Sequence, residues 1–378
     1  MVKTIKRSVP FTLRFSNTAK LEVIDATAKE YRRVTNYFLG RLQKGEELTE
    51  EFLKRFSTPL SYRYKQCAKR QALAVQNSWE RRWKKRLDKI ERLKRHNPGS
   101  KRIPEPPKPP RLRKPAMVLD ERFITVEKGV NSFDYWARIA TINKGRPILV
   151  PVRSYRHANG YIDDWKLLGG GRLVRKNGTW TLILTFEKKV EQRGDATPLG
   201  VDIGYRKLIT TSDAEVIGGG IKSTIERAAR KKKGSRAERA ARQQIRCEIG
   251  HAVNRLPEKT CMVVEDLKNL KKGKKRVWNR KVNNKFNYWY YSLVLKRIEE
   301  RCEVAGVQCH RVPPANTSRD CPLCGHLDEL NREGESFRCL GCGFSHDADY
   351  VGSLNVLSRF TGEPVVPRSV KPELVFVP

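Results

Sequence analysis

Four cysteines near the C-terminus have the residue type and the spacing of a metal site. They form two C-x-x-C pairs separated by fourteen residues, and they are Cys321, Cys324, Cys339 and Cys342. This ligand count and spacing are typical of a tetrahedral structural zinc site. A glycine follows each pair, and a residue without Cβ lets the turn fold around the metal and direct N–H groups at the thiolates. The sequence therefore predicts bound Zn²⁺.

Three carboxylates occupy positions where carboxylates are costly to bury. Asp202 lies inside the apolar run L-G-V-D-I-G, Glu265 ends T-C-M-V-V-E-D-L, and Asp349 opens an apparent helix after the cysteines. Each acid alone is typical of a solvated strand end or a helix cap. Burial requires pairing or a metal, and Mg²⁺ prefers such hard oxygen ligands. Taken together, they predict a Mg²⁺ site, and two ions about 4 Å apart there can activate water and stabilise a leaving 3′-oxygen in phosphodiester cleavage.

Alternating strands and helices must position these acids. Short apolar runs predict strands at residues 199–204, 206–212, 260–267 and 307–312, whereas helical spacing covers 223–255, 286–305 and 350–360. The cysteine segment interrupts this α/β region just before its last helix. We expect a catalytic domain with a small inserted metal module.

The charge of the chain indicates a polyanionic partner. With 378 residues and a formal net charge of +37, the sequence has room for two or three domains and an isoelectric point near 10.1. Such an excess favours nucleic acid, with a membrane surface as the alternative. A hydrophobic content of 38% still predicts a sizeable core and excludes a disordered basic tail.

Cysteine usage and hydropathy predict the compartment. Of the nine cysteines, four form the predicted metal site and the other five show no pairing pattern, which favours a reducing environment. No signal segment or apolar run of about eighteen residues is present. We expect a cytoplasmic, prokaryotic protein that is nucleoid-associated when bound to DNA.

The first part of the chain predicts one strand followed by two helices. Residues 4–15 alternate as a strand does, and helical spacing covers 17–42 and 61–95. In the second helix an apolar stripe comprises Trp79, Trp83, Leu87 and Ile90. Its basic face is either a solvated surface or, as the charge favours, a nucleic-acid contact that includes Arg81, Lys84 and Lys85. The proline-rich residues 96–114 predict an extended linker or an exposed loop.

Beyond this segment the hydrophobic period changes to two. Strands are expected at 123–126, 137–142, 148–152 and 173–186, with a hairpin turn at Asn177 and Gly178. We therefore expect residues 1–15 and 115–192 to form one β-barrel, interrupted by the helical insertion 16–114.

Further basic and aromatic segments lie in the last part of the chain. The basic face of 223–255 is a solvated helix or, in our interpretation, a nucleic-acid contact that includes Arg227, Arg230, Lys231 and Arg239. The charged residues 268–281 predict a lid over the acids or a surface loop. The aromatic residues 288–291 could stack on bases, but helical spacing favours core packing.

The motifs G-V-D-I-G, V-V-E-D-L, C-x-x-C-G…C-x-x-C-G and D-Y-V-G-S-L-N-V resemble the RuvC-type motifs of the TnpB (OrfB) family. Insertion sequences encode these proteins, which are similar to compact type V CRISPR effectors. The resemblance implies an RNase H-like nuclease domain over 196–316 and 345–360, a zinc ribbon over 317–344 and a C-terminal tail over 361–378. It also implies a wedge-like barrel and a helical recognition lobe in the part that precedes them.

The function implied is RNA-guided DNA cleavage beside a short adjacent motif. The resemblance implies Asp202, Glu265 and Asp349 as catalytic acids, catalytic Mg²⁺, structural Zn²⁺, and guide RNA and double-stranded target DNA as partners. One departure is the last motif, which reads D-Y-V-G-S-L-N where the family usually has D-x-N-A-A-x-N. Side chains two residues apart on a helix diverge by about 200°, so Asp347 and Asp349 cannot both face one metal pair. The resemblance implies Asp349 as the catalytic acid, because it keeps the family's six-residue spacing to Asn355, and Asp347, which precedes the helix, is then predicted as its N-cap.

Three other functions remain open at this point. A guided repressor that binds without cutting would be expected to lack an acid, and an RNase H-type transposase would need a separate domain for transposon ends. An unguided Holliday-junction nuclease would not need the large basic first half.

Overall fold

The computed structural model describes the chain except for residues 97–104, 106, 130–132, 177, 268–278, 366–374 and 378. It has two compact units, one of residues 6–188 and one of residues 1–5 with 189–378. Each unit is described by itself. The expected mixed α/β fold is confirmed. Among the described residues, no helix has the length and the apolar character needed to span a bilayer.

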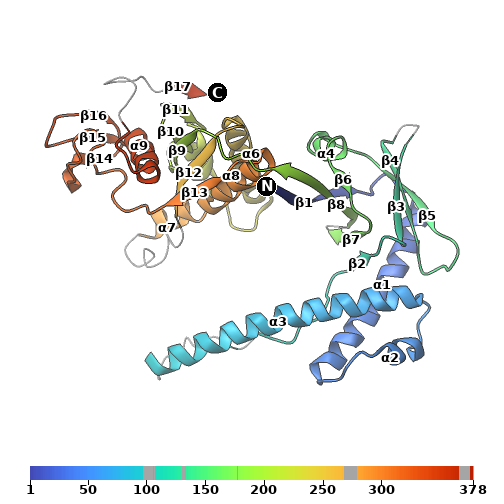
Figure 1. Ribbon diagram of the computed structural model, residues 1–378. Helices are drawn as coiled ribbons and strands as arrows, with labels where there is room; N and C mark the ends of the chain where they lie inside the picture. The colour runs from blue at the N-terminus through green and yellow to red at the C-terminus, as the bar shows by residue number, and fades with distance from the viewer. Residues whose placement is uncertain are drawn as a thin grey trace. The chain divides into compact units, whose positions relative to one another are not determined.

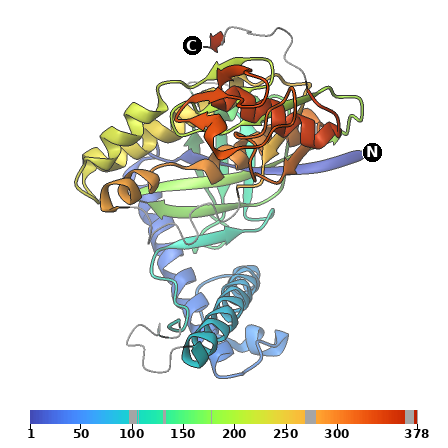
Figure 2. The ribbon, with the colours of Figure 1, turned by 90° about the vertical axis from the view of Figure 1, so that its left-hand side faces the viewer.

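The first unit is built on two long helices, α1 (Thr18–Gln43) and α3 (Tyr62–His96), with α2 (Glu50–Arg55) between them. The helices predicted over 17–42 and 61–95 are therefore confirmed. Asn17 begins α1, because its side chain accepts the amide hydrogen of Lys20. Helices α1 and α3 pack against each other (Figure 2). Between them the buried rings of Tyr31 and Tyr64 meet edge-on.

The proline-rich segment lies along these helices. The indole of Trp79 donates to the carbonyl of Pro107 at 3.3 Å, and the side chain of Asn36 bonds to both backbone groups of Leu112. The described part of the segment, residues 105 and 107–114, is thus attached to α1 and α3. Along the predicted apolar stripe, Ile90 is buried, whereas Trp83 is 38% exposed and stacks on Trp79.

The expected β-barrel is not observed among the described residues. One sheet has the order β1 (Val2–Thr12), β8 (Thr179–Glu191), β7 (Gly171–Lys176), β2 (Ala116–Leu119), and β6 (Lys166–Leu167) also pairs with β8. A turn at Asp120–Phe123 ends β2, so the chain starts a second sheet. That sheet contains only β3 (Ile124–Lys128), β4 (Tyr135–Ile139) and β5 (Ile148–Val152), and the short helix α4 (Arg156–Ile162) follows it. The predicted hairpin residue Asn177 lies outside the described residues.

The second unit contains a six-stranded sheet. Its order is β13 (Cys309–Val312), β12 (Cys261–Glu265), β9 (Pro198–Asp202), β10 (Ile209–Thr211), β11 (Glu215–Ile217), β17 (Val375–Val377). The strands β13, β12 and β9 are parallel, whereas β9, β10 and β11 form an antiparallel meander. The residues expected to be a C-terminal tail thus contribute a strand that pairs with β11.

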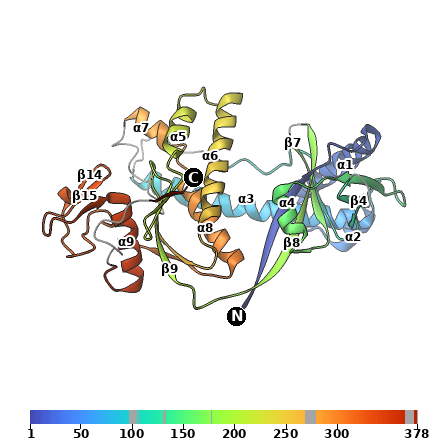
Figure 3. The ribbon, with the colours of Figure 1, turned by 90° about the horizontal axis from the view of Figure 1, so that it is seen from above.

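Helices cover the two faces of this sheet (Figures 1 and 3). Helices α5 (Ile221–Ala229), α6 (Arg236–Arg255) and α8 (Tyr291–Ala305) share one large core with Leu199, Val201, Met262 and Val264. Helix α9 (Ala348–Thr361) packs on the opposite face, where Val263 meets Val356. Because successive strand residues point to opposite faces, Asp202 and Glu265 lie on the α9 face.

Local differences from the sequence predictions have local causes. The single helix expected over 223–255 is broken into α5 and α6, because Gly234 adopts φ +83° and Ser235 then caps α6. A short helix, α7 (Arg280–Phe286), precedes α8. Tyr288 and Trp289 are buried in the large core, which confirms that the aromatic residues 288–291 are mainly packing residues.

Candidate active site and metal centre

Two of the three predicted acids end neighbouring parallel strands. Val201 of β9 pairs with Val264 of β12, so Asp202 and Glu265 each follow that pair by one residue. Both carboxylates therefore emerge at the same end of the sheet and on its α9 face. Glu265 is only 8% exposed, and the hydroxyl of Thr317 donates a hydrogen bond to its Oε1.

Helix α9 brings the third acid to the same place. Asp349 lies in its first turn and is 8% exposed. One turn later, the Cα of Gly352 faces Asp202 so closely that a Cβ there would lie 3.5 Å from the Asp202 Cγ. A Cβ on Gly204, just beyond β9, would lie 3.7 Å from Asp349 Oδ2. The structure thus places Asp202, Glu265 and Asp349 in one cluster.

Asp347 has a different role from Asp349. Its carboxylate accepts the amide hydrogens of Asp349 and Tyr350, at 3.1 and 3.2 Å, and so caps α9. The predicted N-cap is therefore confirmed, although the helix begins two residues earlier than expected. The ammonium group of Lys207, which is buried, pairs with Asp347 and lies 3.9 Å from Asp349 Oδ2.

The acids are crowded and poorly solvated. Burial raises the pKa of Asp202 well above its usual range, and the negative charges of Glu265 and Asp349 raise it further. Burial likewise raises the pKa of Glu265, and burial followed by the charge of Asp347 raises that of Asp349. The guanidinium of Arg332 opposes the rise at all three carboxyls.

The chemistry of this donor set suits a divalent cation, although among the described residues only the four cysteines have all their ligand atoms within 4.8 Å of one another. Three largely buried carboxylates repel one another, and a cation bound among them would offset that repulsion. Carboxylate oxygens are also the ligands that Mg²⁺ prefers. The Thr317 hydroxyl and the cap at Asp347 hold two of the ligand-bearing groups in place. Asn355 supports Thr317 in turn, since its amide donates to the Thr317 and Asp320 carbonyls, both at 2.7 Å.

The four cysteines converge as a zinc site requires. Their sulfur atoms all lie within 4.8 Å of one another, and the closer pairs, Cys321 with Cys342 and Cys324 with Cys339, are at 3.6 and 3.5 Å. Tetrahedral Zn–S bonds of about 2.3 Å place sulfur atoms roughly 3.8 Å apart, so the cluster fits Zn²⁺. The amide of Cys342 points at the Cys339 sulfur, as expected for a thiolate ligand.

A small sheet supports the cysteine cluster. Its strands are β14 (Arg332–Glu333), β15 (Ser336–Arg338) and β16 (Ser345–Asp347), and β16 continues directly into α9 (Figure 1). Phe337 and Phe344 share a buried core with Val351 of that helix. The cysteine segment is therefore packed on the helix that carries Asp349.

The predicted nucleic-acid contacts are exposed. Arg81, Lys84 and Lys85 lie on the surface of α3 in the first unit. In the second unit, the exposed residues lie on α5, on α6 and in the turn between them, and they are Arg227, Arg230, Lys231 and Arg239. The expected lid, 268–281, lies almost wholly outside the described residues.

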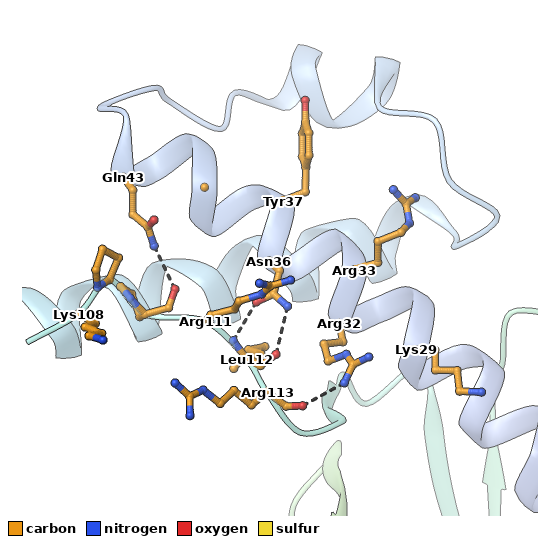
Figure 4. Close-up of a pocket in the computed structure, with 13 residues that line it drawn as sticks. Lys29, Arg32, Arg33, Asn36, Tyr37, Gln43, Lys108, Arg111, Leu112 and Arg113 are labelled. Atoms are coloured by element: carbon orange, nitrogen blue, oxygen red, sulfur yellow. Dashed lines mark hydrogen bonds between the residues drawn. The ribbon is translucent and has the colours of Figure 1, made fainter.

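A basic groove of about 960 Å³ was not anticipated from the sequence (Figure 4). Helix α1 forms one wall and the proline-rich segment the other, with cationic lining residues Lys29, Arg32, Arg33, Lys108, Arg111 and Arg113. Arg33 is paired with Glu30. Within the described part of the chain, the ion pairs of this structure leave Lys29, Lys108, Arg111 and Arg113 without a carboxylate partner. In the sequence, the only sign of this groove is the alternation of proline and basic residues in the proline-rich segment. That pattern does not predict that the segment packs on α1.

Comparisons with known proteins agree with this architecture. The family model of the Cas12f1-like TNB domain matches residues 291–356. A putative transposase of Methanocaldococcus jannaschii is 34% identical over 84 residues, a match that covers 20% of this chain and 77% of that protein. The chain belongs to the TnpB-like family. The resemblance of its motifs is thereby confirmed.

Other relatives are longer or more distant. A TnpB-like protein of M. jannaschii is 26% identical over 99 residues, covering 26% of this chain and 34% of that protein. A Cas12f1 CRISPR-associated endodeoxyribonuclease of Sulfoacidibacillus thermotolerans is 34% identical over 96 residues, covering 25% of this chain and 20% of the relative. The match therefore spans about a fifth of that protein. The solved mini-RNA-guided endonuclease Cas_phi3 shares the fold, with a TM-score of 0.50, 11% identity, and coverage of 97% of this chain and 93% of that one.

Proposed function

We propose that this TnpB-like protein is an RNA-guided DNA endonuclease of the RuvC type, encoded by a transposable element. The observation that carries the proposal is the meeting of Asp202, Glu265 and Asp349 on one face of the sheet beneath α9. Three mutually repelling carboxylates have no evident purpose in a packed domain unless they bind cations. The relatives named as endodeoxyribonucleases and transposases support DNA as the substrate.

In this proposal the three acids hold catalytic Mg²⁺. Bound there, Mg²⁺ would lower the pKa of an attacking water and stabilise charge on the phosphate and on the leaving 3′-oxygen. The chain's own residues keep the ligands aimed: Thr317 orients Glu265, and the Asp347 cap fixes the first turn of α9. The four cysteines hold structural Zn²⁺.

We assign guide and target binding to the basic surfaces. Sequence-independent cations suit a protein in which base pairing reads the sequence and the chain holds the backbone of the heteroduplex. The groove beside α1 and the exposed basic residues of α3, α5 and α6 are the surfaces that we propose for this role (Figure 4). Residues 196–316 with 345–360 are proposed as the nuclease domain, 317–344 as the zinc ribbon, and the prokaryotic cytoplasm as the location.

Sequencing the RNA that co-purifies with the protein tests guidance directly. A single defined RNA species, which then directs Mg²⁺-dependent cleavage of a complementary DNA beside an adjacent motif, is the expected result. Random cellular RNA, with no guided cleavage, would contradict the proposal. Guided binding without cleavage would instead favour a repressor.

A further inference from the structure

A threonine stands beside Asp202 on the neighbouring strand. Thr210 of β10 pairs directly with Asp202 of β9 in the antiparallel part of the sheet. Directly opposed residues of two strands point to the same face, so both side chains lie on the face that α9 covers. The Cβ atoms of such a pair are about 4.5–5.5 Å apart, which brings a threonine hydroxyl within reach of a carboxylate.

The hydroxyl of Thr210 is buried without a hydrogen-bond partner. The residue is 1% exposed, and in the part of the chain that the structure describes no group bonds to its Oγ1. A buried hydroxyl without a partner destabilises a protein, whereas valine has nearly the same shape and carries no such penalty. Other buried hydroxyls of this region do have partners, namely those of Thr211, Ser212, Thr317 and Ser353. Thr210 therefore keeps an uncommitted donor inside a packed site.

The neighbours of Thr210 leave Asp202 as its natural acceptor. On its other side, β11 places Val216, which is buried and apolar. Helix α9 packs on both β9 and β10, and a Cβ on Gly352 of this helix would lie 3.5 Å from the Asp202 Cγ. The carboxylate is thus confined between the helix and the sheet. Of the two cross-strand neighbours of Thr210, only Asp202 has a side chain that accepts a hydrogen bond.

The acid on the next strand already has such a donor. The hydroxyl of Thr317 donates to Oε1 of Glu265, and the amide of Asn355 holds Thr317 by its carbonyl at 2.7 Å. A carboxylate that accepts one such bond keeps its second oxygen for a cation. Hydrogen bonds of this kind are typical of metal sites, where the outer partner fixes the orientation of the ligand.

We propose that Thr210 is a positioning residue for Asp202. In the cation-loaded protein its hydroxyl donates to one oxygen of the Asp202 carboxylate and leaves the other oxygen for the cation. A rotation about the Cα–Cβ bond of the threonine moves the hydroxyl between staggered rotamers, so the bond requires no movement of either strand. Thr210 acts through Asp202 and does for the acid of β9 what Thr317 does for the acid of β12. This inference rests on the proposed function, because the cation belongs to it.

Thermal unfolding with zinc bound and no other divalent cation is the first arm of the test. The control is Thr211, which pairs with Val201, points to the opposite face and accepts the amide hydrogen of Glu215 at 3.2 Å. Thr210→Val should melt at or above the wild-type temperature, because it loses an unsatisfied hydroxyl. Thr211→Val should melt lower, because the Glu215 amide loses its acceptor. A lower melting temperature in Thr210→Val would overturn the assignment, since the hydroxyl would then stabilise the fold.

Binding of Mn²⁺ alone to the zinc-loaded protein, followed by electron paramagnetic resonance, is the second arm and needs no cleavage. The relevant signal is the one that Asp202→Asn removes. Thr210→Val should weaken this binding about tenfold, as expected when the outer partner of a metal ligand is lost. Thr210→Ser keeps the hydroxyl and should bind within about threefold of wild type, and Thr211→Val within about twofold.

Guided cleavage is the third arm. At limiting Mn²⁺, Thr210→Val should cleave about 10–100-fold more slowly than wild type, and saturating Mn²⁺ should recover most of the loss. Unchanged Mn²⁺ affinity in Thr210→Val, or an equal loss in Thr210→Ser, would overturn the assignment. A wild-type protein that binds no Mn²⁺ would overturn both this inference and the proposed function. If the wild type binds Mn²⁺ but cuts no DNA, only the proposed function fails, and the Mn²⁺ arm still decides the role of Thr210.

Discussion

Asp347 caps the helix on which Asp349 presents its carboxylate to the acid cluster. The two acids are two residues apart, yet Asp347 accepts backbone amide hydrogens whereas Asp349 lies in the acid cluster. Two glycines allow the close approach there, since Gly352 of α9 faces Asp202 and Gly204, just beyond β9, faces Asp349. Their side chains diverge as helical geometry requires. Because the two residues have different roles, substitution of Asp347 is a matched control for substitution of Asp349.

Asp349→Ala should therefore abolish cleavage, whereas Asp347→Ala should keep most of the activity. Its loss of the cap should lower the free energy of unfolding by about 1 kcal/mol, and the buried Lys207 left without its partner should lower it further. Asp347→Asn, which can still cap the helix, should lose less stability than Asp347→Ala. Urea unfolding and guided cleavage measure the two effects separately. Cleavage that survives Asp349→Ala but is lost in Asp347→Ala would reverse the assignment.

The sequence predicted the acids because their signals are local. A carboxylate in an apolar strand, and one at a helix start beside a second capping acid, can be recognised without tertiary information. Arg332 could not be found in this way, because its place depends on the pairing of β14 with β15 and of β15 with β16. Its residue type is common in a chain with 78 Lys and Arg.

The basic groove and the arrangement of the sheets also depend on tertiary contacts, so local sequence patterns could not predict them. A proline-rich basic run predicts extended backbone, but its docking on α1 depends on tertiary hydrogen bonds from the side chains of Arg32, Asn36 and Gln43 (Figure 4). Alternating strands predict sheets, but a barrel also needs pairing at every edge. The turn after β2 separates the strands into two sheets, and no alternation of residues encodes that separation.

Two glycines near the acids should respond oppositely to alanine. A Cβ on Gly352 would meet Asp202 at ordinary contact distance, 3.5 Å, so Gly352→Ala should retain cleavage and stabilise α9 by about 0.5–1 kcal/mol. A Cβ on Gly200 would lie 2.1 Å from the Ser353 carbonyl oxygen, so Gly200→Ala should displace the helix and destabilise the protein. Thermal unfolding distinguishes them, and a stable Gly200→Ala protein would contradict this packing.

The stability of the metal-free protein should depend on pH through Asp202. Its pKa is raised on folding, chiefly by burial, so the folded chain binds more protons than the unfolded chain above pH ~4. The contribution of this carboxyl to stability is therefore lost as pH rises through the raised pKa. In EDTA, Asp202→Asn should gain stability over wild type at pH 8 and gain much less at pH 5. An advantage that grows as pH falls would refute this sign.

Zinc should be both present and structural. Metal analysis should find about one Zn²⁺ per chain, and Cys321→Ser should lower zinc content and the melting temperature, because the fold of the ribbon depends on its metal. Cys247→Ser is the control, since Cys247 is an exposed cysteine of α6 outside the cluster. A fully stable protein without zinc would contradict the structural role.

The most direct test of the account compares guided cleavage and guided binding in Asp202→Asn. The variant keeps the shape of the side chain and removes one charge of the proposed metal site, whereas Asp213→Asn changes an exposed aspartate as the control. We predict that Asp202→Asn lowers cleavage more than about 1000-fold, a barrier increase of roughly 4 kcal/mol, while its affinity for guide RNA and target DNA stays within a few-fold of wild type. Cleavage within tenfold of wild type would contradict the assignment of Asp202 to a catalytic metal site.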